Sequence, residues 1–75
     1  MEIACFSVVA LLKEKYCKQY GEYLSHDIWL TPDKIIIRLP QTKTIHIDLV
    51  ETIALDILGI GIWEFDYWLG QNHIC

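Results

Sequence analysis

The stretch DIWLTPDKIIIRLP, residues 27–40, decides the fold that the sequence predicts. Two runs rich in β-branched and aromatic residues flank the tetrapeptide TPDK, which has a proline at its second position and an aspartate at its third. Proline favours the second position of a type I turn because its ring already holds the backbone angle that the turn requires. We therefore predict a β-hairpin whose second strand, residues 35–39, ends at Pro40.

Residues 44–48, TIHID, alternate apolar and polar side chains and predict a third strand. Pairing Leu39 with Ile45 keeps the apolar residues of both strands on one face. The same register sets Arg38 opposite His46 on the other face, where the two could orient an anionic ligand. A solvated cross-strand pair is the simpler interpretation of these two residues.

Two amphipathic helices are predicted around this sheet. Residues 2–20 carry apolar side chains at helical intervals, and Gly21 follows at a position where a helix readily ends. Residues 49–58 repeat the pattern after Asp48 and Glu51, which have the spacing of a capping box.

The segment GIWEFDYWLG, residues 61–70, alternates at period two and predicts a fourth strand. Its buried face would carry Trp63, Phe65, Tyr67 and Leu69, and its exposed face Ile62, Glu64, Asp66 and Trp68. The pairing of this strand is left open. We expect the tail over residues 70–75 to fray.

The predicted order is α-β-β-β-α-β, a small α+β domain of residues 1–75 with helices packed on one face of an antiparallel three-stranded meander. A chain of this size buries only about 60–65% of the surface that its unfolded form exposes. Because 53% of the residues are hydrophobic, we expect some apolar surface to remain for a partner.

The N-terminus and the cysteines indicate a soluble, cytoplasmic protein without a cofactor. Glu2 stands where a signal peptide needs basic residues, and the apolar run after it is too short to cross a bilayer. Cys5, Cys17 and Cys75 lack metal-ligand spacing and predict free thiols. His73 with Cys75 supplies too few ligands for a metal site.

No catalytic constellation is recognisable in the sequence. His26 and Asp27 are adjacent on a predicted strand, so their side chains point to opposite faces and cannot form an acid–base dyad. Cys5 and Cys17 lie on or near the predicted buried stripe, whereas a reactive thiol needs an open, electropositive setting. We therefore expect no enzymatic activity.

The charges are divided along the chain. All six lysines and arginines precede residue 44, and residues 44–75 carry five acids and no lysine or arginine. Such a segment repels a phosphate backbone and attracts a basic protein. Tryptophan is enriched where partners bind most tightly. The predicted partner-binding residues are therefore Glu64, Asp66, Trp68, Glu51 and Asp56.

The resulting hypothesis is a small acidic protein-interaction module that inhibits or regulates a larger, basic, nucleic-acid-handling protein. Immunity proteins, antitoxins and phage or plasmid antagonists form this class. Two alternatives stay open: a homo-oligomer that buries the same surface, or a nucleic-acid-binding module that uses a basic helix face of Lys13, Lys15 and Lys18. Whether Trp68 belongs to the core or to the interface is also left open.

Overall fold

A computed structural model describes residues 1–72 and confirms a small α+β domain with a three-stranded antiparallel sheet. The sheet has the strand order β2-β3-β4, and a second sheet pairs β1 with β5. The elements are β1 (Glu2–Ala4), α1 (Cys5–Glu14), β2 (Lys18–Tyr23), β3 (His26–Leu30), β4 (Ile36–Pro40), β5 (Thr44–His46), α2 (Ile47–Glu51), the π-helix η1 (Thr52–Ile57) and α3 (Ile62–Asn72).

The predicted hairpin is confirmed as β3 and β4. The two strands pair antiparallel, with Trp29 opposite Ile37. In the turn, the N–H of Lys34 donates to the carbonyl of Thr31 at 2.9 Å, and the hydroxyl of Thr31 accepts from the N–H of Ile35 at 2.9 Å. The hydroxyl therefore satisfies a backbone donor that the turn would otherwise leave without a partner.

The third strand of this sheet is β2, which pairs with the other side of β3. Gly21 lies within β2 and does not end the first helix as predicted. Residues 44–46 instead form β5 and pair with the N-terminal strand β1. The predicted pairing of Leu39 with Ile45 is wrong, because Ile45 lies opposite Ile3 and both of these isoleucines are buried.

Helix α1 ends earlier than the sequence pattern predicts, because the chain reverses at Tyr16. This residue has a left-handed φ of 65°. The N–H of Cys17 donates to the carbonyl of Leu12 at 2.9 Å, and the N–H of Tyr16 donates to that of Lys13 at 3.0 Å. These bonds define a Schellman ending, and the burial of Leu12 and Cys17 supplies the apolar pair that accompanies it.

Replacing Tyr16 with glycine is expected to stabilise the fold by roughly 0.5–1 kcal/mol, because a left-handed backbone is costly for residues with a Cβ. The ring of Tyr16 is 81% exposed, so little packing is lost. Urea denaturation measures the change. Tyr16→Ala is the control, since it removes the ring but keeps the strain, and an equal gain from alanine would contradict this explanation.

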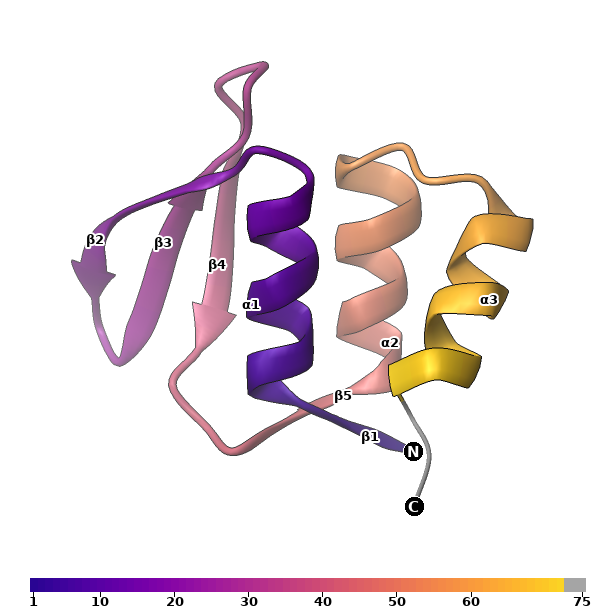
Figure 1. Cartoon of the computed structure of the whole chain (residues 1–75). Helices are drawn as coiled ribbons and strands as arrows, with labels where there is room; N and C mark the ends of the chain where they lie inside the picture. Colours follow the sequence, from indigo (N-terminus) through magenta and orange to yellow (C-terminus); the bar gives the residue numbers. More distant parts are fainter. Residues whose placement is uncertain (73–75) are drawn as a thin grey trace.

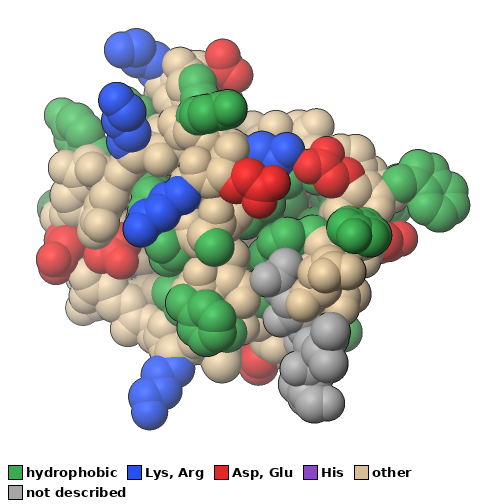
Figure 2. Space-filling model, viewed as in Figure 1, with side chains coloured by type: hydrophobic (Ala, Val, Ile, Leu, Met, Phe, Trp, Pro, Cys, Tyr) green, Lys and Arg blue, Asp and Glu red, His purple; other side chains and the backbone are tan. Residues whose placement is uncertain are grey.

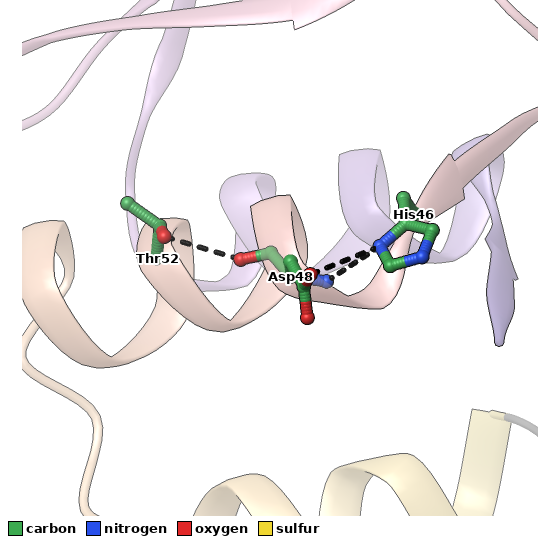
Figure 3. Close-up of polar contacts among 3 residues, drawn as sticks. All are labelled: His46, Asp48 and Thr52. Atoms are coloured by element: carbon green, nitrogen blue, oxygen red, sulfur yellow. Dashed lines mark hydrogen bonds and ion pairs between the residues drawn. The ribbon is translucent and has the colours of Figure 1, made fainter.

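The second predicted helix is present as α2 followed by η1, but its cap differs. The N-cap is His46 rather than Asp48, and its Nδ1 accepts a hydrogen bond from the N–H of Asp48 at 3.1 Å (Figure 3). The hydroxyl of Thr52 donates to the carbonyl of Asp48 at 3.1 Å, a bond that competes with regular helix pairing where η1 begins. The N–H of Leu58 then reaches back five residues, to Ile53, at 2.9 Å.

Residues 62–72 form helix α3, so the predicted fourth strand is wrong. The first helical bond runs from the N–H of Phe65 to the carbonyl of Gly61 at 2.9 Å. Phe65, Trp68 and Leu69 recur at intervals of three and four residues, and this stripe packs against the core. The helix includes residues 70–72 of the expected tail, and residues 73–75 lie outside the described part of the chain.

The sheet, α1, α2 and α3 stand in a row, with α1 and α2 between the sheet and α3 (Figure 1). One cluster of buried side chains joins them; it includes Val8, Leu11 and Leu12 of α1, Trp29, Ile37 and Leu39 of the sheet, Val50, Ile53 and Ala54 of α2 and η1, and Phe65 of α3. Among residues 1–72, no helix is long and apolar enough to cross a membrane.

Candidate interaction surface

The outward side of α3 is the first candidate surface. Ile62, Trp63 and Tyr67 are 62%, 84% and 71% exposed, and Asp66 is exposed beside them. A helix advances about 100° per residue, so these four side chains lie within one arc opposite Phe65 and Trp68. We call these four residues the α3 outer face. Figure 2 shows hydrophobic side chains protruding on the side of the molecule where α3 lies in Figure 1.

This arrangement reverses part of the predicted division of the segment. Phe65 is buried as predicted, but Trp63 and Tyr67, which were assigned to the core, point outward. Trp68, which was assigned to the partner surface, is half-buried and stacks on Phe65 with ring centroids 6.0 Å apart. The exposed tryptophan of this helix is therefore Trp63.

Glu64 is tied to the rest of the domain by an ion pair. Its Oε2 accepts a hydrogen bond from Nζ of Lys15 at 2.7 Å. That hydrogen bond raises the pKa of Lys15, and burial lowers it by less. Because Glu64 is exposed and Lys15 is half-buried, solvent screens the pair, and it adds little to the stability of the fold. Glu64, already paired with Lys15, is less available to a partner than Asp66.

A cavity of about 240 Å³ lies where α3 meets α1. Its lining includes Leu11 and Glu14 of α1 and Glu64, Phe65 and Trp68 of α3. The predicted site residues Glu64 and Trp68 therefore meet at this seam, on the flank of α3 rather than on its outer face. Tyr67 of the α3 outer face also lines this cavity, so the seam adjoins that face.

The other two predicted site residues lie on a different helix. Glu51 and Asp56 line a shallow depression of about 220 Å³ along α2 and η1, together with Asp48, Thr52 and Leu55. All three carboxylates are exposed there. The predicted partner-binding residues are thus divided among the depression, the seam and the α3 outer face. They share the acidic sign of this half of the protein but do not form one site.

The described cysteines are free and shielded. Cys17 is buried, and burial raises the pKa of its thiol. Burial also raises the pKa of Cys5, and the charge of Asp27 adds to this effect. Both thiols are therefore poor nucleophiles at neutral pH. Within residues 1–72, no group of three or more His, Cys, Asp or Glu could hold a metal, and the predicted pair His73 and Cys75 lies outside that range.

The basic helix face considered for nucleic-acid binding is not formed. Lys13 lies in α1, Lys15 follows it and binds Glu64, and Lys18 begins β2. Only Lys13 is in the helix, so the three lysines do not present one basic surface on it. Arg38 lies opposite Ile28, so the predicted Arg38–His46 pair is not formed either.

A surface that the sequence does not predict lies on the three-stranded sheet. Strand register places three rows of side chains on the face turned away from Trp29 and Ile37: Lys18, Leu30 and Ile36; Gly21, Ile28 and Arg38; and Tyr23, His26 and Pro40. Tyr20, at the irregularity in β2, joins them. We call these residues the outer sheet face. The segment KQYGEY has no alternating pattern that would have predicted a strand, because its two tyrosines are three residues apart.

Comparison of the chain with protein-family models, with curated protein sequences and with solved structures gives no match.

Proposed function

We propose that this protein binds a larger protein by seating the α3 outer face in an apolar groove with a basic rim. The observation that carries the proposal is the 84% exposure of Trp63, on the same face of α3 as Ile62 and Tyr67. Water-exposed tryptophan is unfavourable for a soluble domain unless another surface covers it. A partner's groove would supply that cover.

The spacing of these residues suits binding by a helix. Trp63 and Tyr67 are four residues apart, so their rings lie on neighbouring turns of one face. Apolar anchors at this spacing are the feature by which a helix binds in a hydrophobic groove. Phe65 and Trp68 hold the opposite side of α3 on the domain, so the anchors are presented on a helix that is already folded. Such preorganisation lowers the entropy cost of binding.

The acidic residues around α3 favour a partner whose groove has a basic rim. Asp66 lies between the anchors, and residues 44–75 hold no lysine or arginine. Asp48, Glu51 and Asp56 extend the negative potential along the neighbouring helix. A basic partner would be steered toward this half of the molecule and would find carboxylates around the aromatic anchors. Proteins that handle nucleic acid carry such basic surfaces, and a bound acidic domain would block them. A stoichiometric inhibitor is the role that fits this chemistry.

The substitution Trp63→Ala tests this proposal, once the partner has been captured from the native cell or host. We expect Trp63→Ala to weaken binding of the purified partner by about 30-fold or more, because buried tryptophan is a leading contributor at interfaces. Asp66→Lys should slow association, and this effect should fade at high salt.

Phe6→Ala is the matched control, since Phe6 is an exposed aromatic residue of α1 rather than of α3. The control should bind as tightly as the unmodified protein. Equal losses from Trp63→Ala and Phe6→Ala would contradict the assignment, as would a captured partner whose binding surface is acidic.

A further inference from the structure

The outer sheet face is bare and unusually apolar for the solvent side of an antiparallel sheet. Such a sheet normally carries polar residues on the face that no helix covers. Here Ile28 and Leu30 are half-buried, and Ile36, Tyr20 and Tyr23 are exposed. An apolar patch of this kind marks a binding surface.

The patch is hollowed rather than flat. A groove of about 450 Å³ runs between β2 and β4, and its lining includes Tyr20, Tyr23, Ile28, Ile36 and Arg38. The two tyrosines and the isoleucines offer side chains for an aromatic anchor to pack against. The groove is wide enough to accept a bulky side chain from another chain.

The charged residues of the three rows are basic, Lys18 and Arg38, with no aspartate or glutamate among them. Glu22, which strand register assigns to the opposite face, also lines the groove and accepts a hydrogen bond from Nε2 of Gln41 at 3.0 Å. Two cations and one carboxylate leave this surface with a net positive charge. A matching occupant would therefore be apolar, aromatic and acidic.

We infer that the occupant is the α3 outer face of a second copy of this chain. Ile62, Trp63 and Tyr67 supply the apolar and aromatic side chains, and Asp66 supplies the carboxylate for Arg38 or Lys18. No lysine or arginine in residues 44–75 opposes this approach. This inference rests on the proposed function, because it takes α3 as the docking element and names one groove that the helix fits.

The contact must form between molecules. α1 and α2 separate the sheet from α3, so a chain cannot place its own α3 on its own outer sheet face (Figure 1). The two surfaces differ, so the association is heterologous and either closes into a ring or continues head to tail. A larger partner that binds α3 would occupy the helix that a copy inserts into the groove of its neighbour, although the groove of that copy stays free. Self-association through α3 and partner binding at α3 therefore compete.

Sedimentation of the purified full chain over a range of concentrations tests the inference. We expect the unmodified protein to form dimers and larger species at about 100 µM. Arg38→Glu, which alters only the groove, and Asp66→Lys, which alters only the helix, should each raise the dissociation constant of the self-associated form about tenfold or more. A protein that stays monomeric at this concentration overturns the inference, while loss of partner capture by Trp63→Ala would still support the proposed function.

Mixing the two variants separates head-to-tail contact from other modes. Trp63→Ala paired with Arg38→Glu provides one copy with an intact groove and one with an intact helix. Each variant alone should be monomeric, and the equimolar mixture should form a dimer that grows no further. If Arg38→Glu abolishes association but Trp63→Ala and Asp66→Lys do not, the sheet pairs with its own copy and the inference is overturned.

Discussion

Replacing Ile37 with alanine is expected to remove a large part of the stability of this protein. Ile37 is 1% exposed and faces the core from β4. Truncating a buried isoleucine costs about 2–5 kcal/mol, because its burial is lost and a cavity remains. A domain of 75 residues has a total stability of roughly 4–11 kcal/mol. Urea denaturation followed by circular dichroism should show a large fall in the midpoint.

The neighbouring isoleucine provides the control. Ile36 has the same side chain in the same strand but is 58% exposed on the outer sheet face. Ile36→Ala should change the free energy of unfolding by less than about 1 kcal/mol. Both variants are measured in dilute solution, where copies of the chain are not associated. Comparable losses from the two substitutions would show that β4 does not turn one face inward and the other to solvent.

Replacing Phe65 with alanine is expected to release α3 from the domain. Phe65 is 4% exposed, stacks on Trp68 and is the residue of α3 that belongs to the buried core. We expect a loss of about 3–5 kcal/mol for the truncation, including the stacking contribution. Trp68 would lose its stacking partner, so its fluorescence should shift to longer wavelength. Proteolysis within residues 62–72 should become faster.

Trp63→Ala is the matched comparison for Phe65→Ala, because both substitutions remove an aromatic ring from α3. The exposed Trp63 should change stability by no more than about 0.5 kcal/mol. A strand over the same residues would place the two rings on one buried face, and both substitutions would then be costly. The difference between the two variants therefore distinguishes a helix from a strand.

The hairpin was predictable because its signals are local. The turn residues Thr31, Pro32 and Asp33 and the β-branched strands on either side agree with one another. The second helix was predictable for a similar reason, since its apolar residues keep a helical interval. Its cap was not, because the side chain of His46 replaced Asp48 as the hydrogen-bond acceptor at the N-terminus of α2.

The first helix shows where periodicity misleads. Tyr16 and Tyr20 continued the apolar stripe of α1, yet both are exposed. The chain turns at Tyr16 because Cys17 is buried with Leu12, which places the following residues alongside β3. The position of this turn depends on packing against the sheet, so the helical pattern of the sequence does not predict it.

Composition predicted the acidic and aromatic character of the candidate site, and the structure corrected which of its residues are exposed. The sequence located acids and aromatic residues in the C-terminal half, and the structure retains that character. It exchanges Trp68 for Trp63 as the exposed anchor, because a helix rather than a strand presents the segment. It also adds the outer sheet face, which combines residues of β2, β3 and β4.

By itself, the sequence determined the α+β class, the hairpin and the acidity of the C-terminal half, because these follow from neighbouring residues and from composition. Only the tertiary structure decided that residues 62–70 of GIWEFDYWLG are helical. The apolar residues of this segment fit both the two-residue period of a strand and the 3.6-residue period of a helix, and the outcome depends on which set of side chains can be buried. In this protein the stripe of Phe65, Trp68 and Leu69 packs against the core. Burial of that stripe leaves Trp63 and Tyr67 facing solvent.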